Sequence, residues 1–479
     1  MNRPKADTLA VVPLDARPCT RSFPVAIGEM AGANVLVPPP ELLGDIVRPG
    51  SRDDLLSWLE DVAGEVDAAV VALDTLLFGG LIPARRSTLA LENLVARLDR
   101  IARLPVPVYA FAVTMRISDS HVAEEEMPYW AEFGKAIYRW SFHADRHAQL
   151  GDPADAGVAR QARASIPESV VDDFLSRRRR HLAVHEHELA LARRGAFKVL
   201  CLTQDDTSPF GFNQAEKRQL LASAPANALI YPGADEVATC LVGRWINDRQ
   251  GRSPAFRLEA FPPEGGEIVA MYEDRPLSAT AAGQVRAVGG RLVERGADLD
   301  LLLDAPATGQ GDLALQVDLD RVDSPERDLA PLIERLRQGP PAALADVAYA
   351  NGADVRLWDL LGPLDLSRLA AYAAWNTAGN TLGTVVAMAS AYLSGSFDPG
   401  RHRAFMLDRL ADDYLYQGIL RREIRQEDRP LLPSESELGD RLAALWRQRL
   451  AHVPIAGIRA SFPWNRTFEA AVEVDQGFS

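Results

Sequence analysis

The stretch from Lys198 to Asn213 combines a buried apolar run with groups that can do acid–base chemistry. Its first residues, KVLCLT, form a short run with β-branched members, which is typical of a buried strand. Gln204, Asp205 and Asp206 follow directly. Paired carboxylates supply the acid and the base or nucleophile of glycoside cleavage. The alternative for either aspartate is that it only bonds loop amides, since such turns are common.

A second acidic pair follows the next strand-like segment. Residues 228–231 are predicted to form a short strand, and Asp235 and Glu236 stand before a helical pattern that runs to Ile246. This pair is the next candidate for a catalytic acid or base. The alternative for Asp235 is that it caps the following helix.

Polar side chains also follow other predicted strands. In parallel α/β folds, ligands bind at the carboxyl ends of the strands, so we expect these side chains to converge in one cleft and to hold a substrate. Aromatic residues such as Tyr231 and Trp375 complete a lining suited to a ligand with many hydroxyl groups. The expected substrate-binding residues are Asp15, Arg17, Asp74, Arg116, Asn351, Asp354, Asn376 and Asn380.

No cofactor is expected, but a divalent metal is an alternative. Asp15, Asp74, Asp205 and Asp206 offer oxygen ligands of the kind that suit magnesium, manganese or calcium. His181 and His185 are four residues apart and could share a helix face, which is one metal-ligand spacing. The competing interpretation is an ordinary charged helix with a solvated face.

Strand and helix patterns alternate along most of the chain. They predict an α/β fold of mostly parallel sheets flanked by helices, in two α/β units followed by a helical C-terminal region. The predicted domains are residues 1–250, with a helical insertion near 120–197, then 251–395 and 396–479. The alternative is a single (β/α)8-barrel-like domain, which would gather the polar strand ends on one face.

Composition narrows the classes of function. The chain has 479 residues and a net charge of −14, which argues against a nucleic-acid surface. No segment approaches the roughly 20 apolar residues that are needed to cross a bilayer. The N-terminus does not resemble a signal peptide. The three cysteines are scattered along the chain, so they indicate neither a disulfide framework nor a zinc cluster. We therefore expect a cytoplasmic protein with no membrane or nucleic-acid partner; the oligomeric state is left open.

Several catalytic motifs are missing from the sequence. It contains no GxSxG elbow, no Walker loop and no GxGxxG after a strand. Serine-elbow hydrolysis and nucleotide binding therefore have no support.

Seven short motifs together resemble an uncharacterised bacterial group, domain-of-unknown-function family 4127. The resemblance spans most of the chain and implies no activity or catalytic residue, so no role is transferred from it. The motifs are PLDARP at Pro13, ALDTLLFGGLIPAR at Ala72, TMRIS at Thr114, TQDD at Thr203, YPGADE at Tyr231, ANGAD at Ala350 and WNTAGNTLG at Trp375.

The residues themselves favour a carbohydrate-active enzyme, a glycoside hydrolase acting on a small-molecule or oligosaccharide substrate. Asp205 and Asp206 would be the central carboxylates, with Asp235 or Glu236 as a further acid or base. Because successive residues of an extended chain point to opposite sides, we expect Asp205 and Asp206 to have unequal roles. The alternatives are a divalent-metal-dependent hydrolase and a non-catalytic sugar-binding protein.

Overall fold

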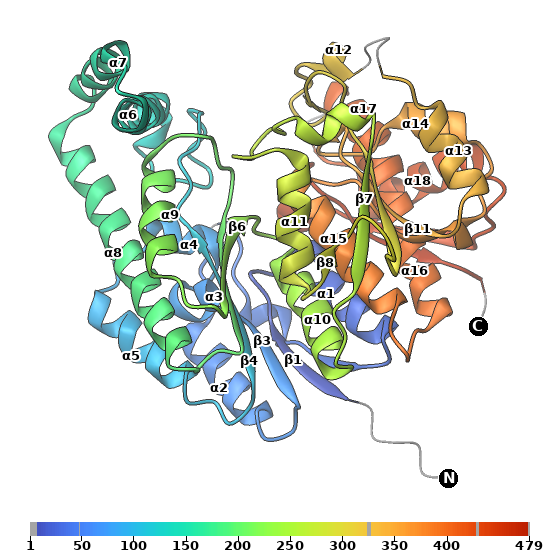
Figure 1. Cartoon of the computed structure of the whole chain (residues 1–479), viewed down its shortest axis with the longest axis horizontal. Coiled ribbons are helices and arrows are strands. Elements are labelled where there is room, and N and C mark those ends of the chain that lie inside the picture. Colours follow the sequence, from blue (N-terminus) through green and yellow to red (C-terminus); the bar gives the residue numbers. More distant parts are fainter. Residues whose placement is uncertain (1–6, 47, 323–326, 428–430, 478–479) are drawn as a thin grey trace. The chain divides into compact units, whose positions relative to one another are not determined.

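The computed structural model describes residues 7–46, 48–322, 327–427 and 431–477, which form two compact units (Figure 1). Unit 1 comprises the described residues of Met1–Ala16, Asn34–Ala238 and Tyr272–Asp274. Unit 2 comprises those of Arg17–Ala33, Thr239–Met271 and Arg275–Ser479. The three domain ranges expected from the sequence stay a prediction.

Unit 1 is built on a six-stranded parallel sheet. Most of its strands are short, fully buried apolar runs, as expected for a sheet with both faces covered. The strand order is β2-β1-β3-β4-β5-β6. The strands are β1 (Thr8–Val12), β2 (Asn34–Leu36), β3 (Ala68–Ala72), β4 (Val108–Thr114), β5 (Val199–Gln204) and β6 (Ala228–Pro232).

Eight α-helices of unit 1 follow or connect these strands. The longest is α8, and α6 packs closely on α7. A separate hydrophobic cluster joins Trp130 of α6 to Phe174 of α8. The segment predicted as a helical insertion therefore builds a small core of its own. The helices are α2 (Arg52–Val62), α3 (Leu73–Phe78), α4 (Leu81–Arg86), α5 (Leu91–Ile101), α6 (Trp130–Leu150), α7 (Pro153–Ala164), α8 (Glu168–Arg193) and α9 (Phe212–Ser223). A short 3-10 turn, η1, covers Pro40–Leu42.

Unit 2 contains a five-stranded parallel sheet in the order β13-β11-β9-β7-β8. A two-stranded parallel pair, β10 with β12, and an antiparallel pair, β14 with β15, accompany it. The strands are β7 (Ala255–Phe261), β8 (Arg291–Leu292), β9 (Leu299–Asp304), β10 (Gly311–Asp312), β11 (Ala342–Asp346), β12 (Tyr349–Ala350), β13 (Leu369–Ala373), β14 (Gly457–Ser461) and β15 (Ala471–Asp475).

Helices of unit 2 cover this sheet. The helix α15 is buried along almost its whole length, because its many small residues allow close packing against β13 and β11. The helices are α1 (Pro18–Met30), α11 (Leu277–Ala287), α12 (Leu319–Val322), α13 (Ala330–Gln338), α14 (Val355–Leu361), α15 (Ala378–Tyr392), α16 (Pro399–Arg409), the π-helix η4 (Leu410–Leu420), α17 (Arg421–Gln426) and α18 (Glu435–Arg449). Single 3-10 turns lie at η2 (Pro263–Glu267), η3 (Leu366–Arg368) and η5 (Pro463–Asn465). The helix α10 (Val237–Arg249) contributes residues to both units.

The predicted fold class is confirmed. Both large sheets are parallel, and each contains strands from only one side of residue 250. No closed ring of strands is found in the described part of the chain, so the barrel alternative has no support there. Within the same residues, no helix is long and apolar enough to cross a membrane.

Candidate functional site

Asp205 and Asp206 lie in unit 1 immediately after β5, where the parallel strand gives way to a loop. Gly233, which follows β6, donates its backbone N–H to the carbonyl of Gln204 at 3.0 Å, and this bond fixes the end of β5 beside its neighbour. Asp206 adopts a left-handed backbone conformation with φ of 38°. This conformation is uncommon for a residue other than glycine and ends the strand geometry at Asp206. Such conformations cluster at functional sites.

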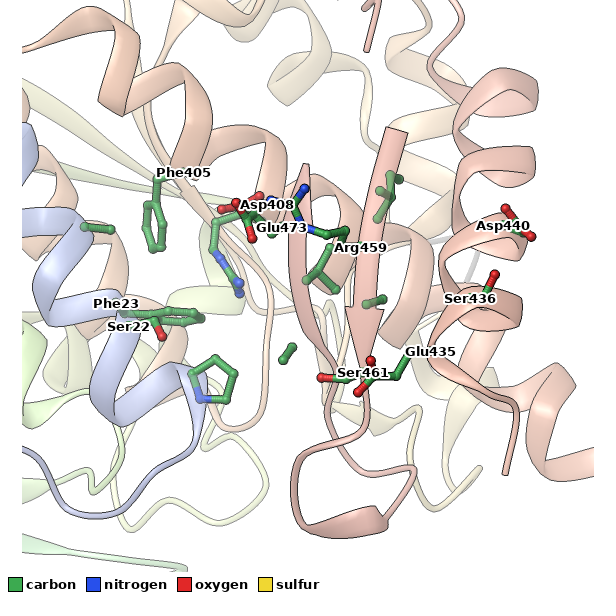
Figure 2. Close-up of a pocket in the computed structure, with 17 residues that line it drawn as sticks. Ser22, Phe23, Phe405, Asp408, Glu435, Ser436, Asp440, Arg459, Ser461 and Glu473 are labelled. Atoms are coloured by element: carbon green, nitrogen blue, oxygen red, sulfur yellow. Dashed lines mark hydrogen bonds and ion pairs between the residues drawn. The ribbon is translucent and has the colours of Figure 1, made fainter. Parts of the chain in front are cut away.

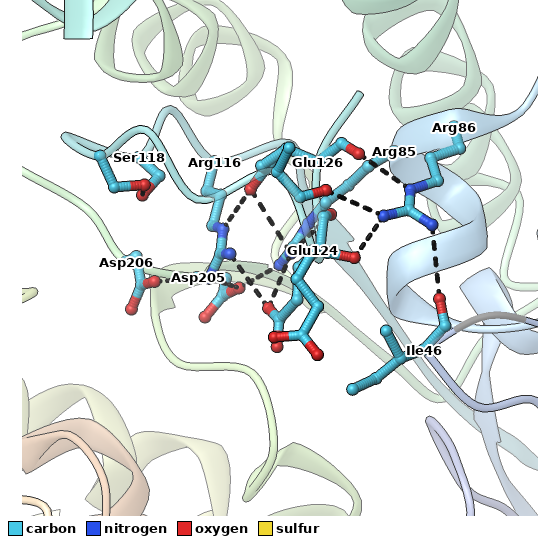
Figure 3. Close-up of polar contacts among 12 residues, drawn as sticks. Ile46, Arg85, Arg86, Arg116, Ser118, Glu124, Glu126, Asp205 and Asp206 are labelled. Carbon is cyan, nitrogen blue, oxygen red and sulfur yellow. Dashed lines mark hydrogen bonds and ion pairs between the residues drawn. The ribbon is translucent and has the colours of Figure 1, made fainter. Parts of the chain in front are cut away.

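Two arginines hold this carboxylate pair (Figure 3). Arg85 at the end of α4 contacts Asp205 Oδ2 through Nη2 at 2.5 Å. Arg116, just beyond β4, contacts Asp206 Oδ2 through Nη1 at 2.6 Å, and the same nitrogen lies 3.6 Å from Asp205 Oδ2. The two aspartates are therefore neighbours in space as well as in sequence, and Arg116 touches both.

Glu125 and Glu126 complete the cluster from the loop after β4. Arg116 contacts Glu126 Oε1 at 2.7 Å and Glu125 Oε2 at 3.0 Å, and Arg85 lies 3.3 Å from Glu125 Oε2. Arg86 donates to the backbone carbonyls of this loop, including that of Glu126 at 2.9 Å, which positions both glutamates (Figure 3). Four carboxylates thus surround two guanidinium groups.

The pKa of Asp206 is shifted in these surroundings. Burial and the neighbouring Asp205 raise the pKa of Asp206 from its usual range to about 7, although Arg116 and Arg85 oppose the shift. The Asp206 side chain keeps 28 % of its exposure and that of Asp205 keeps 16 %, so both are within reach of a ligand. Because Oδ2 of Asp206 accepts from Arg116, a proton on this carboxyl belongs on Oδ1, where it can be donated.

The sequence analysis did not single out Arg85, Glu125 and Glu126. Arg85 is the last residue of the quoted segment ALDTLLFGGLIPAR, and the two glutamates belong to the run EEE at 124–126. These were the available signals. These three residues reach the site only because of the paths of the loops that carry them. The positions of strand ends in the sequence do not predict those paths.

Asp235 and Glu236 are both buried in unit 1. Glu236 Oε2 accepts the backbone N–H of Ala234 at 2.9 Å, and the glycine at position 233 leaves room for the Glu236 carboxylate. This contact gives Glu236 a role in fixing the turn between β6 and α10. Catalysis by Asp235 or Glu236 stays a prediction.

Asp74 lies in the first turn of α3, with 1 % exposure. Its Oδ2 accepts the backbone N–H of Val113 at 2.7 Å, which ties α3 to β4. Burial raises the pKa of Asp74 to about 7, while His185 opposes the shift. Asp15, the other acidic residue expected at an equivalent strand end, is also a buried residue of unit 1.

The remaining predicted substrate-binding residues belong to unit 2. The structure brings two of them together, since Asn351 donates its backbone N–H to the carbonyl of Asn376 at 2.7 Å. Both have left-handed backbones, with φ of 61° and 51°. Asn351 Nδ2 also donates to Asp312 Oδ2 at 3.0 Å. The single cleft expected to unite these residues with Asp15, Asp74 and Asp206 stays a prediction.

Arg17 and Asn380 have separate surroundings in unit 2. The Arg17 guanidinium lies 4.8 Å from the ring centroid of Trp464, and 3.7 Å separates its Nη1 from Glu469 Oε2. Asn380 is buried in the first turn of α15, and its Oδ1 has no hydrogen-bond donor among the described residues. Thr377 caps this helix by accepting the Asn380 backbone N–H at 3.3 Å.

Asp354 forms part of a buried charge cluster in unit 2. It caps α14 by accepting from the Arg356 backbone N–H, and Arg327 Nη1 donates to its Oδ2 at 2.8 Å. Arg327 also contacts Asp304 at the end of β9. Asp346 at the end of β11 accepts the Asp354 backbone N–H at 2.9 Å. Burial raises the pKa of Asp304 to about 7 and that of Asp346 well above its usual range, although the charge of Arg327 opposes both shifts.

A further pair of carboxylates, Asp412 and Asp413, lies in the π-helix η4. Arg409 Nη1 donates to Asp413 Oδ1 at 2.6 Å and to Asp412 Oδ2 at 3.3 Å. Asp413 Oδ2 accepts the backbone N–H of Ala374 at 2.7 Å, next to Trp375. The sequence analysis saw only helical periodicity here and did not identify these residues.

His181 and His185 are explained by packing. His181 stacks on Phe78 at 4.8 Å, and its Nε2 lies 3.0 Å from the carbonyl of Ala84. Burial lowers the pKa of His181 to about 3, so its ring is neutral. His185 Nδ1 pairs with Glu188 at 2.8 Å. Among the described residues, no group of three or more His, Cys, Asp and Glu side chains could hold a metal ion.

Comparison with known proteins places the chain in one family. The model of the family described as "Protein of unknown function (DUF4127)" matches residues 9–473, so the chain belongs to this family, as the seven motifs indicated. No curated protein and no solved structure matches the chain.

Proposed function

We propose that unit 1 is a hydrolase of the glycosidase type, with Asp206 as its acid. One observation carries the proposal: two adjacent, partly exposed carboxyl groups share a guanidinium nitrogen, and Asp206 has its pKa raised to about 7. A carboxyl with a pKa near neutrality is well matched to proton donation at that pH.

The proposal assigns each carboxyl group a role. Asp206 would donate the proton on Oδ1 to the glycosidic oxygen as the bond from that oxygen to the anomeric carbon breaks. Asp205 would attack the anomeric carbon and form a glycosyl ester, and water would then cleave the ester while Asp206 takes a proton from that water. Over the two steps the leaving alcohol gains a hydrogen and the sugar gains a hydroxyl group, together the elements of one water molecule, and Asp206 ends protonated as it began.

The separation of the carboxyl groups favours this retaining route. Both Oδ2 atoms lie within reach of Arg116 Nη1, at 2.6 and 3.6 Å, so the two carboxyl groups lie closer together than the roughly 6.5–9.5 Å of an inverting pair. The narrower spacing of about 5–5.5 Å belongs to retaining enzymes. Arg85, Glu125 and Glu126 add donors and acceptors for ligand hydroxyl groups beside the pair.

The test is a panel of chromogenic glycosides, assayed with and without a chelator. We expect turnover that survives chelation. Asp206→Asn should lower kcat about 10²- to 10⁴-fold, the usual contribution of a positioned proton donor. The matched control is Asp172→Asn on the exposed side of α8, which removes the same charge and should leave kcat unchanged.

Three results would contradict the proposal. Turnover abolished by the chelator would favour a divalent-metal-dependent hydrolase. Saturable sugar binding without turnover would favour a sugar-binding protein. An Asp206→Asn variant with normal kcat would remove the acid from the mechanism.

A further inference from the structure

Unit 2 has a pocket of about 680 Å³ between α1 and α16 on one side and α18 with the β14–β15 pair on the other (Figure 2). The rings of Phe23 and Phe405 are each 4 % exposed, and the guanidinium carbon of Arg409 lies 3.9 Å and 5.3 Å from their centroids. The aromatic surface is therefore covered by the protein's own side chains, and no ligand class follows from this pocket. A more definite arrangement lies in unit 1.

In unit 1, a short segment from far along the chain reaches the loop that carries Asp206. Tyr272–Asp274 belongs to unit 1, although the preceding part of this unit ends at Ala238. The backbone N–H of Thr207 donates to the carbonyl of Tyr272 at 3.0 Å. Thr207 directly follows Asp206, so this bond holds the planar peptide group that joins the two residues. It therefore restrains the backbone torsion ψ of Asp206.

The backbone is in an unusual conformation on both sides of this contact. Asp206 has φ of 38° and Tyr272 has φ of 68°. A left-handed backbone is uncommon for residues other than glycine, and it is an outlier for a bulky residue such as tyrosine. Such conformations persist only where the surrounding structure imposes them. The hydrogen bond from Thr207 to Tyr272 thus joins two positions that tertiary contacts must hold.

A buried side-chain network anchors the segment to α9. Gln214 Nε2 donates to Asp274 Oδ2 at 3.0 Å, and the same nitrogen donates to Thr207 Oγ1. Asn213 Nδ2 donates to that hydroxyl oxygen at 3.3 Å. Lys217 pairs with Asp274, and their side chains are only 9 % and 3 % exposed. One amide group therefore connects the anchored segment with the loop.

The far end of the same loop is held by α6. The backbone N–H of Gly211 donates to Asp145 Oδ2 at 3.0 Å, and that of Phe212 donates to Ser141 Oγ at 2.7 Å. Both acceptors belong to buried residues of α6. The loop after Asp206 is therefore fixed at both ends, and the segment Tyr272–Asp274 supplies the fixed point nearer to this carboxyl group.

We infer that the segment Tyr272–Asp274 is a positioning element, which holds the carboxyl group of Asp206 beside Asp205. Within it, Asp274 acts through Gln214, so Asp274 is a positioning residue and has no direct part in catalysis. The inference rests on the proposed function in treating Asp206 as the acid. Support of this kind matters for a proton donor, because a displacement of about 1 Å can lower the rate ~10²-fold.

The test removes the anchor without changing the net charge. The double variant Lys217→Met, Asp274→Leu replaces a buried ion pair with apolar side chains, an exchange that is often neutral for stability. Urea unfolding checks that it folds. The second variant, Gln214→Met, removes the bridging amide and keeps the ion pair. The control is Arg100→Met, Glu60→Gln, which removes an ion pair between α5 and α2.

The readout is the midpoint of a carbon-13 NMR titration of the Asp206 carboxyl group, assigned from the loss of its signal in Asp206→Asn. In the wild type, burial and Asp205 raise the pKa of Asp206 to about 7. Once the segment is released, the carboxyl group can move into solvent, so we expect the midpoint to fall by roughly one unit or more. An unchanged or raised midpoint in the double variant, or in Gln214→Met if the double variant does not fold, would overturn the inference. An equal fall in the control would do the same.

This readout needs no substrate, so the inference and the proposed function can fail separately. On a glycoside that the wild type cleaves, kcat of the double variant should fall about tenfold or more while KM changes little, because only the proton donor is displaced. A lowered midpoint in a protein that cleaves no glycoside would support the positioning role and contradict the proposed function. An unchanged midpoint together with full glycosidase activity would contradict the positioning role alone.

Discussion

Replacing Asp205 with asparagine should lower the pKa of Asp206. The reason is electrostatic, since the negative charge of Asp205 is one of the causes that hold the Asp206 pKa near 7. The substitution keeps the size of the side chain, and the new amide oxygen can still accept from Arg85. Without the charge of Asp205 to balance, Arg85 and Arg116 would also stabilise the ionised form of Asp206 more effectively.

The magnitude follows from the spacing of the two groups. Two unit charges about 5 Å apart interact by ~0.8 kcal/mol in bulk water and by ~3 kcal/mol at the effective dielectric constant of about 20 that suits sites near a protein surface. These energies correspond to a shift of roughly 0.6 to 2 pKa units. Because the Asp206 side chain is 28 % exposed to solvent, we expect the shift in its pKa to lie near the middle of this range, at about one unit.

The assay is a carbon-13 NMR titration of the aspartate carboxyl groups, with Asp206 assigned from the loss of its signal in Asp206→Asn. The wild type should show a midpoint near 7 and Asp205→Asn a midpoint about one unit lower. Asp172→Asn provides the charge-matched control and should leave the midpoint unchanged. An Asp206 midpoint that stays constant or rises in Asp205→Asn would refute the electrostatic reasoning.

Three further predictions concern stability, each measured by urea unfolding. Arg327→Met should lower the free energy of unfolding by about 3–5 kcal/mol, because it leaves the buried carboxylates of Asp304 and Asp354 without their cation. A decrease below about 1 kcal/mol would contradict this prediction. Gly233→Ala should lower the free energy of unfolding by at least ~1–3 kcal/mol, because φ at this position is 152° and the new Cβ would meet Glu236 Oε1 at 2.0 Å. The control Gly157→Ala lies in the open interior of α7 and should leave this free energy unchanged or raise it. Equal effects of the two substitutions would contradict this reasoning. Asp74, whose folded pKa of about 7 exceeds its unfolded value of about 3.9, contributes stability that is present below pH 4 and is lost as pH rises through 7. Asp74→Asn should therefore reduce the fall in stability between pH 5 and 8 by about 1–3 kcal/mol, and an unchanged fall would exclude Asp74 as a source.

Local patterns predicted several buried strands and the charged groups that follow them. Apolar runs of four to seven residues, each followed by a polar group, identified β5 with Asp205 and Asp206 and β4 with Arg116. These predictions succeed because the period and the length of a strand are local properties.

Partners brought together by tertiary structure could not be predicted in this way. Arg85 meets Asp205 across 120 positions of sequence, and Arg421 meets the carbonyl of Asn351 across 70. Arg17 stands two residues from Asp15 in the sequence, yet the two belong to different units, because the helix that begins at Pro18 packs with α15 and α16.

The pH dependence of kcat/KM on the best glycoside substrate tests the central claim most directly. If Asp206 is the proton donor, kcat/KM should be highest while this carboxyl is protonated and should fall tenfold per pH unit above about 7. In Asp205→Glu, which retains a negative charge at this position, the descending limb should persist even if the rate is lower. A rate that stays constant or rises between pH 7 and 9 would contradict the assignment of Asp206 as the acid.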